Sequence, residues 1–130
     1  MNNIINMTTY AASDEQKSFG VIDLTQDENE KLRMLLRVTN TERNDLLNQA
    51  NNIALFADFL SVKYKTNKCL IGGKSFLIPF ITKSMRDFDI ENYMTNVKQV
   101  TTFVNGEILK SQRHCGVVNC SIYKLKPQLI

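Results

Sequence analysis

The chain has 130 residues, of which 43% are hydrophobic, and a formal net charge of +3. This length allows one domain with a buried core and excludes a second domain of ordinary size. The longest apolar runs, such as residues 76–81, are far shorter than the roughly 20 residues of a membrane-spanning helix, so we expect no membrane partner. The first residues lack the pattern of a secretory signal, which favours a nuclear or cytoplasmic protein that is not secreted.

Charge is distributed unevenly along the chain. Residues 1–60 carry a net charge of −4, and residues 61–130 carry a net charge of +7. A basic half attracts nucleic acid or another anionic partner, but a solvated basic face has the same composition. Both interpretations stay open at this point.

The first 65 residues divide into two predicted segments. Residues 1–20 are rich in Asn, Ser, Thr and Ala without a hydrophobic period, which predicts a flexible tail. Residues 21–65 contain neither Gly nor Pro, which predicts a helical segment. Thr25 and Glu28 have the spacing of a capping box, so a helix should begin at the next residue after Thr25. The helix should weaken at residues 38–41, where β-branched residues and Asn occur.

A second helix is predicted from about Glu42 to Tyr64. Its apolar residues alternate steps of four and three, which is the a/d spacing of a coiled coil. One interpretation is a helix that packs this face on its own domain, and the other is a self-association surface that makes a homodimer. The stripe consists of Leu46, Ala50, Ile53, Ala57, Leu60 and Tyr64.

Residues 66–130 form the third predicted unit. Two short apolar segments flank residues 72–74, which predicts a small β-hairpin. A further helix is predicted over residues 90–104, with Asp89 as its N-cap and Asn105-Gly106 as its stop. The whole pattern predicts a mainly α fold with a small β-hairpin, in which a compact helical domain is preceded by a long helical segment.

Residues typical of catalysis or metal binding are sparse. His114 lies next to Cys115, and Cys120 follows, a set that would suit a cysteine-dependent hydrolase. No C-x-x-C pair is present, and burial as small apolar residues explains Cys69 and Cys120 more simply. We therefore predict no enzyme, no metal site and no cofactor.

Gly72-Gly73-Lys74-Ser75 resembles the end of a phosphate-binding loop. Glycines let backbone N–H groups approach a phosphate, and a lysine adds positive charge. The full pattern also requires a glycine at the position where this chain has Lys68. The incomplete pattern does not predict a nucleotide site.

The cations of the basic half are the candidate nucleic-acid-binding residues. Most are predicted in loops or at helix ends, from which long side chains reach phosphates. Such contacts need no base-specific hydrogen bonds. The set comprises Lys74, Lys83, Arg86, Lys98, Lys110, Arg113, Lys124 and Lys126.

Two stretches of the basic half resemble the core of a BEN domain. They are residues 71–84 (IGGKSFLIPFITKS) and residues 93–109 (YMTNVKQVTTFVNGEIL). In this family an Ile-Gly segment leads to an apolar-Pro pair, to a helix, and to an aromatic or apolar-x-x-Glu-x-Leu element. Phe103 or Val104, with Glu107 and Leu109, takes that last pattern here.

The resemblance spans Leu70 to Gly116 and implies a compact, mostly helical module. Such modules occur in nuclear and DNA-virus proteins, bind DNA or bridge chromatin factors, and often lie beside a coiled coil. Family members usually continue into a further helix that contacts DNA, whereas only residues 117–130 follow here, so base-specific recognition is not implied. On position and charge, the candidate contacts to the DNA backbone are Lys110, Arg113, Lys124 and Lys126.

The segment Val21-Ile22-Asp23-Leu24-Thr25, followed by three acids, resembles a SUMO-interaction motif. Such a peptide adds as a strand to the edge of the modifier's sheet, and its apolar side chains enter a groove. The protein-docking residues would be Val21, Ile22, Asp23 and Leu24. The alternative is a hydrophobic lead-in that packs on the first helix, with Thr25 as its cap.

The sequence therefore predicts a non-enzymatic DNA-binding or chromatin-associated module with a protein-docking N-terminal half. The alternative is a protein–protein adaptor that self-associates through its helical segment without nucleic acid. The expected partners are DNA, SUMO or another protein at residues 21–24, and a second copy of the chain.

Overall fold

The computed structural model describes the backbone of residues 3–121 and, outside residues 97, 98, 100 and 112–115, their side chains. Helices and strands alternate along most of this length. The elements are β1 (Ile4–Met7), α1 (Asp14–Ser18), β2 (Val21–Ile22), α2 (Gln26–Leu36), α3 (Arg43–Tyr64), β3 (Lys68–Ile71), α4 (Ile78–Asp87), β4 (Glu91–Val104) and β5 (Glu107–Asn119).

The five strands form one sheet in the order β2-β1-β3-β4-β5. Neighbouring strands from β2 to β4 are parallel, and β5 is antiparallel to β4. This is one of the two common strand orders of doubly wound α/β sheets. The fold is therefore mixed α/β, and the predicted mainly α fold is wrong.

The predicted division into residues 1–20, 21–65 and 66–130 does not follow the sheet. β1 comes from the first of these segments and pairs with β3 from the last, with Ile5 opposite Cys69. All four residues of β1 are buried, so the predicted flexible tail is wrong. A central parallel strand is buried on both faces, so its sequence is usually a continuous apolar run. Asn6 interrupts this run in β1, and the sequence pattern therefore does not reveal the strand.

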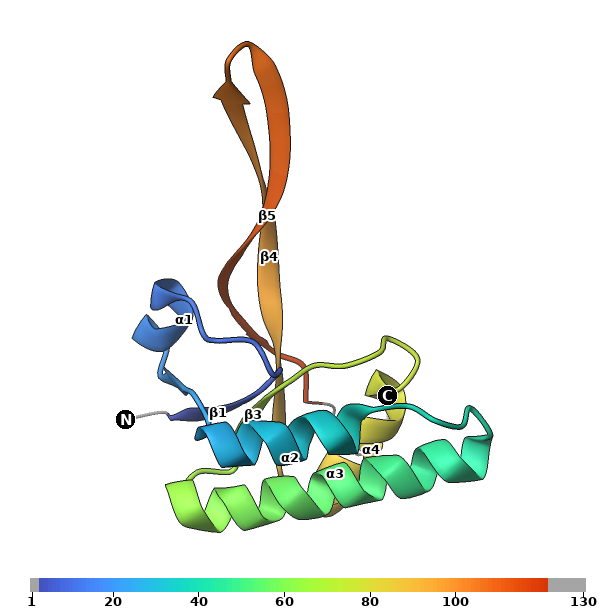
Figure 1. The fold of residues 1–130 in the computed structure, drawn as a ribbon. Helices are drawn as coiled ribbons and strands as arrows, with labels where there is room; N and C mark the ends of the chain where they lie inside the picture. The colour runs from blue at the N-terminus through green and yellow to red at the C-terminus, as the bar shows by residue number, and fades with distance from the viewer. Residues whose placement is uncertain (1–2, 122–130) are drawn as a thin grey trace, which may run out of the picture.

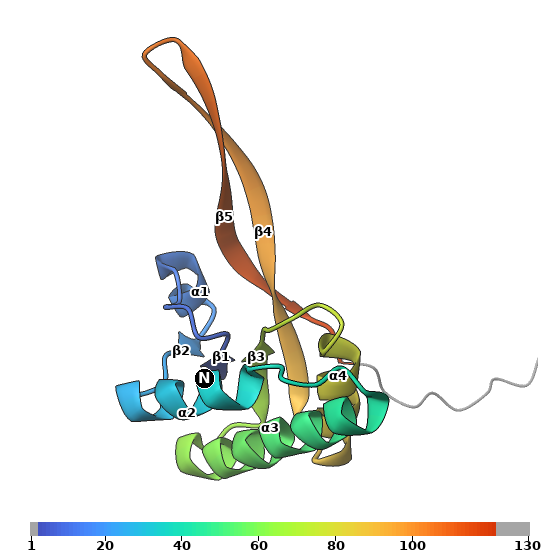
Figure 2. The ribbon, with the colours of Figure 1, turned by 45° about the vertical axis from the view of Figure 1, so that its right-hand side comes forward.

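The helices cover the two faces of the sheet unequally. In Figures 1 and 2, α2, α3 and α4 lie together on one side, while the short α1 lies on the other side next to β5. Ile5, Met7 and Ile71 point into the helical layer, where they join the main core cluster. Ile4 and Leu70 belong to a smaller cluster on the opposite face.

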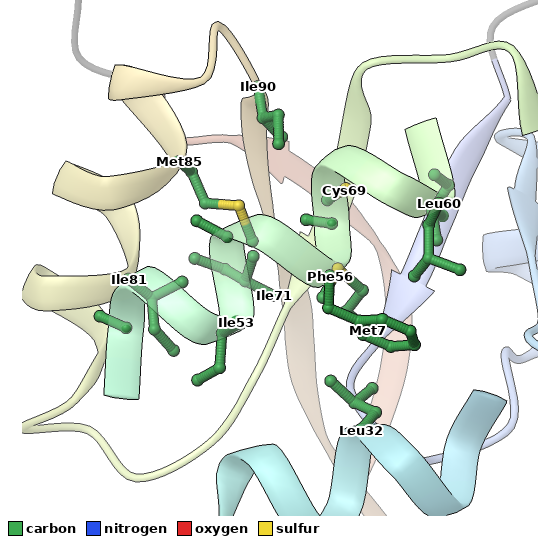
Figure 3. Packing of buried hydrophobic residues seen from close by; sticks show 14 of the residues in the cluster. Met7, Leu32, Ile53, Phe56, Leu60, Cys69, Ile71, Ile81, Met85 and Ile90 are labelled. Carbon is green, nitrogen blue, oxygen red and sulfur yellow. The ribbon is translucent and has the colours of Figure 1, made fainter. Parts of the chain in front are cut away.

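The apolar stripe of α3 lies inside this core. Ile53 and Leu60 are at most 1% exposed and pack with Met7, Leu32 and other core residues (Figure 3). Tyr64 is half-buried at the end of the same stripe. This face of α3 therefore packs on the protein's own domain. It is covered by the core and is not exposed for the predicted self-association. The described residues contain no helix that is long and apolar enough to cross a membrane.

The predicted start of α2 is confirmed. The Thr25 hydroxyl accepts a hydrogen bond from the Glu28 N–H at 3.3 Å, and Glu28 Oε1 accepts one from the Thr25 N–H at 3.0 Å. The Glu28 carboxylate also accepts hydrogen bonds from Lys63 Nζ at 2.7 Å and from Tyr64 Oη at 2.5 Å. Glu28 therefore joins the first turn of α2 to the last turn of α3.

These contacts shift the ionisation of both partners. Burial alone would raise the pKa of Glu28, but the hydrogen bonds from Lys63, Tyr64 and Thr25 outweigh it and lower this pKa to about 2. Burial and the neighbouring Glu28 carboxylate raise the pKa of Tyr64 to about 12. Glu28 is therefore ionised, and Tyr64 protonated, over the whole neutral range.

The protein is expected to lose stability as the pH falls from about 4.5 towards about 2, because the pKa of Glu28 is lowered in the folded state. The stabilisation is complete above the unfolded pKa and is lost as the pH falls through the folded one. Urea unfolding midpoints measured across this range test the prediction. Glu28→Gln should reduce the pH dependence, whereas Glu30→Gln on the exposed side of α2 should retain it. Equal pH dependence in both variants would contradict the prediction.

The region after β3 differs from the sequence prediction. No second strand follows residues 72–74, and Pro79 lies in the first turn of α4, where its missing N–H leaves no helical hydrogen bond unmade. The predicted helix over residues 90–104 is strand β4, because its many β-branched residues suit a strand better than a helix. Asn105 and Gly106 have φ values of 51° and 79°, as in a type I′ hairpin turn.

β4 and β5 extend well beyond the rest of the sheet. β4 pairs with β3 only at residues 91–93, and past this point it pairs with β5 alone. The Gln16 amide donates to Thr95 Oγ1 at 3.4 Å, and a Cβ at Gly116 would meet the Phe19 ring at 3.4 Å, so α1 supports the base of the hairpin. Above an irregularity at Asn96/Val97, the two strands rise from the body as a free hairpin (Figure 1), here called the arm (residues 97–113).

Candidate functional site

The strand order creates a switch point between β1 and β3. The chain leaves β1 towards β2 on one side and leaves β3 towards β4 on the other. The two connections therefore diverge, and a crevice opens at the carboxyl ends of these strands, which is where doubly wound proteins bind ligands. The residues at this edge are Thr8, Thr9 and Tyr10 after β1 and residues 72–77 after β3.

A cleft of about 380 Å³ lies at this position. Three of its lining residues are cations, and all three are exposed: Arg33 and Arg37 from the end of α2, and Lys74 from the loop after β3. Neither ion pair found in the described part of the chain involves any of them. The remaining lining residues are Thr8, Thr9, Tyr10, Leu36 and Gly73.

A buried asparagine shapes the loop after β1. Asn6 is 3% exposed, and its amide donates to the Tyr10 carbonyl at 2.7 Å and to Asp23 Oδ1 at 2.8 Å. Its Oδ1 accepts from the Thr8 N–H at 3.1 Å and from the Thr8 hydroxyl at 2.6 Å. The polar residue that interrupts β1 therefore holds one wall of the cleft.

Thr9 adopts an unusual conformation at the tip of this loop. Its φ is 69°, in the left-handed region that a β-branched residue rarely enters. Such strain persists only where the surrounding structure enforces it, and it clusters at functional sites. The hydrogen bonds of Asn6 on both sides of Thr9 supply the enforcement here.

The loop after β3 approaches the loop after β1 closely. A Cβ on Gly72 would lie 3.2 Å from the Thr8 Cα, so a side chain there would push the two loops apart. Gly73 has a φ of 124°, a conformation that side chains rarely allow. Gly72 therefore allows the close contact between the two loops, and the residues that follow it, Gly73 and Lys74, line the cleft.

The structure distributes the predicted nucleic-acid-binding residues over several elements. Lys74 alone lines the cleft. Lys83 and Arg86 lie on α4, where Lys83 Nζ is 3.5 Å from Asp87 Oδ2. Lys98, Lys110 and Arg113 lie on the arm, with Lys98 opposite Arg113 in the strand register. Lys124 and Lys126 lie outside the described residues.

Sequence reasoning missed Arg33 and Arg37. Both belong to the acidic half of the chain, whose net charge of −4 hides the two neighbouring cations. Their spacing of four residues near the end of a helix places them on the same face. This signal was present in the sequence, but only the fold shows that the face lines the cleft.

The predicted docking peptide is part of the protein's own sheet. Val21 and Ile22 form β2, in which Val21 is 3% exposed, and Leu24 is 8% exposed in the main core. Asp23 Oδ1 accepts hydrogen bonds from Asn6 and from the Ala12 N–H at 3.0 Å. The side chains that would enter a partner's groove are therefore used internally, as in the alternative of a hydrophobic lead-in.

Burial disfavours the reactive thiolate form of Cys69 and Cys120. Burial raises the pKa of Cys69 to about 12, and burial likewise raises the pKa of Cys120, whose Sγ donates to the Asn92 carbonyl at 3.4 Å. Burial of Cys69 and Cys120 was the prediction; it is confirmed for Cys69, whereas Cys120 is only half-buried. The side chains of His114 and Cys115 are not among those described. Within the described part of the chain, no three His, Cys, Asp or Glu residues are grouped to hold a metal.

A second cavity, of about 240 Å³, lies at the opposite edge of the sheet. It is lined near the amino ends of β3 and β4 by residues of both charges, including Arg86, Asp89 and Glu91. Ligands of doubly wound sheets bind at the carboxyl ends. The cleft between β1 and β3 is therefore the stronger candidate.

No protein-family model, curated protein or solved structure matches this chain. The BEN resemblance therefore stays a prediction. The mostly helical fold that it implies for Leu70 to Gly116 is not the fold observed, since this region consists of β3, α4, β4 and most of β5.

Proposed function

We propose that the protein binds a phosphorylated small molecule, of the nucleotide class, in the cleft between β1 and β3. The observation that carries the proposal is the convergence of Arg33, Arg37 and Lys74 on the cleft at the switch point of the sheet. Three cations concentrated at one crevice favour an anion with more than one negative charge.

The kinds of residue match a phosphate better than a carboxylate alone. Arginine presents a planar fork of donors that suits phosphate oxygens, and lysine adds a point charge. Gly73 lines the cleft without a side chain, so a ligand can approach the backbone closely there, as in other phosphate-binding loops. The fold therefore supports a phosphate site where the incomplete sequence pattern did not.

Other features of the cleft suit the rest of a nucleotide. The Tyr10 side chain is 77% exposed at its rim, and an aromatic ring in that position offers a stacking surface for a base. A volume of about 380 Å³ lies at the low end of the range for small-molecule sites. A mononucleotide therefore fits the cleft better than a dinucleotide.

Isothermal titration calorimetry with nucleoside mono-, di- and triphosphates tests the proposal. We expect Arg33→Gln with Arg37→Gln to weaken binding at least about tenfold, equivalent to about 1.4 kcal/mol. The matched control is Lys17→Gln with Arg43→Gln, which removes two exposed cations from α1 and α3 and should leave the affinity unchanged. Added salt should also weaken binding.

Two further ligands identify the chemistry that is recognised. The unphosphorylated nucleoside should not bind, and inorganic phosphate should compete with the nucleotide. Equal binding of nucleoside and nucleotide, equal losses in the two double variants, or no binding of any nucleotide would overturn the proposal.

DNA binding stays a prediction from the sequence. The described cations that it invokes lie on three separate parts of the molecule, namely the cleft, α4 and the arm. Titration of duplex DNA in the same assay into the wild type, and into the double variant at positions 33 and 37, tests this prediction. DNA binding that the double variant retains would place DNA on cations outside the cleft.

A further inference from the structure

The tip of the arm carries exposed apolar side chains on both faces, with Glu107 opposite Val104 on one of them. In the register of the hairpin Phe103 lies opposite Ile108, and these two residues share one face. Val104 and Leu109 lie on the other face, because successive residues of a strand alternate. All four are exposed, from 47% for Leu109 to 75% for Phe103. A two-stranded hairpin with both faces in water is only marginally stable, so a partner that covers the tip would stabilise it.

The body carries a second uncovered apolar surface, between α2 and α3. It is a groove of about 360 Å³. Phe59 is 60% exposed and Leu55 is 53% exposed, and the rings of Phe56 and Phe59 are stacked with centroids 6.4 Å apart. The groove is lined by Lys31, Leu35, Asn52, Leu55, Phe56 and Phe59.

The two surfaces offer one pair of opposite charges, Lys31 in the groove and Glu107 at the tip of the arm. Lys31 is the only charged residue of the groove lining, and its Nζ lies 5.2 Å from the centre of the Phe56 ring. Glu107 follows the turn of the arm and is exposed beside the apolar tip. Neither residue takes part in the ion pairs found in the described part of the chain.

We propose that the arm tip of one copy docks in the groove between α2 and α3 of a second copy, with Glu107 next to Lys31 of the other chain. The arm cannot reach its own groove, because it rises on the far side of the sheet from α2 and α3 (Figures 1 and 2). Reciprocal docking uses both arms and both grooves and closes a two-fold dimer. One type of partner then covers both exposed apolar surfaces.

This surface differs from the self-association stripe that the sequence suggested. Leu46, Ala50, Ile53, Ala57 and Leu60 are buried inside the protomer. Leu55 and Phe59 lie on the outward face of the same helix, in positions that the a/d pattern leaves out. A second copy of the chain is thus recognised by the exposed face of α3 and not by its buried one.

Sedimentation velocity of the full chain over a range of concentrations tests the proposal. The wild type should associate to two copies. Phe103→Ser with Ile108→Ser, and separately Leu55→Ser with Phe59→Ser, should weaken association at least about tenfold, or about 1.4 kcal/mol. Phe76→Ser is the matched control, since Phe76 is 45% exposed but belongs to neither surface. Circular dichroism checks that each variant keeps its fold.

Two mixing experiments distinguish this contact from other apolar associations. The tip variant retains a groove and the groove variant retains an arm, so an equimolar mixture should form a heterodimer through one intact contact. Glu107→Lys and Lys31→Glu should each weaken association, and the doubly reversed chain should recover it.

Three outcomes would overturn the proposal. They are a wild type that remains monomeric, a dimer that the tip and groove variants leave unchanged, and a failure of charge reversal to restore association. Binding of the monomer to phosphatidylcholine vesicles through the tip would also overturn it, because the tip would then serve a lipid surface.

Discussion

Replacing Asn6 with Asp is expected to lower the free energy of unfolding by about 3 kcal/mol. The change preserves the shape of the side chain but removes the amide that donates to Tyr10 and to Asp23. A buried carboxylate then faces the Asp23 carboxylate, formerly 2.8 Å from the amide nitrogen, and the Tyr10 carbonyl is left without its donor. Burial of an uncompensated charge is among the costliest single substitutions.

Urea unfolding at neutral pH measures this loss. Asn48→Asp, on the exposed side of α3, is the matched control and should change stability by less than about 0.5 kcal/mol. Combining Asn6→Asp with Asp23→Asn should recover part of the stability, because the pair of facing carboxylates is removed and the amide introduced at position 23 can donate to the carboxylate at position 6. Recovery is incomplete, because Asp23 Oδ1 contacts both residue 6 and the Ala12 N–H, so an amide nitrogen in its place leaves the Ala12 N–H without an acceptor. Equal losses at positions 6 and 48 would contradict the role assigned to Asn6.

The same substitution also affects the proposed function. Asn6 holds the backbone of residues 8–10, which form one wall of the cleft. Nucleotide binding should therefore weaken in Asn6→Asp and recover in parallel with stability in the double variant. A double variant that recovers its stability but not its affinity for nucleotide would show that residue 6 affects the cleft separately from its effect on folding.

Replacing Leu60 with Ala is expected to cost about 3 kcal/mol. Leu60 is 0% exposed in the centre of the main core, so its truncation removes apolar contacts and leaves a cavity (Figure 3). Val62→Ala, two residues away on the same helix, removes a side chain that is 75% exposed and should change stability by less than about 0.5 kcal/mol. Thermal and urea unfolding of both variants test this difference.

The oligomeric state distinguishes a core position from an interface position. If Leu60 serves only the core, the folded Leu60→Ala variant keeps the same assembly mass as the wild type under conditions where it remains folded. A loss of association with little loss of monomer stability would return the buried stripe of α3 to the role of a dimer surface.

Local signals in the sequence were sufficient for the central helices. The Thr25–Glu28 capping box set the start of α2, and the four-three spacing of apolar residues marked the buried face of α3. The choice between a core face and a dimer face could not be made from spacing alone, since both need the same pattern. It depended on whether other elements, here β1, β3 and α4, cover that face.

Strand pairing between distant segments was the part that sequence patterns did not show. β1 has only four residues and contains Asn6, so it had too little apolar pattern to stand out from a polar tail. β4 carries apolar residues at helical spacing, and Asn105-Gly106 suits a helix end as well as a hairpin turn. The antiparallel partner β5 decides between these structures.

By itself, then, the sequence determined the helices from Gln26 to Tyr64 and the burial of Cys69. The tertiary structure alone decided that the loop after β3 meets Arg33, Arg37 and the loop after β1 at one cleft. The physical reason is that helix caps and periods act between residues a few positions apart. A parallel sheet instead brings together strands, such as β1 and β3, that are some sixty residues apart in the chain.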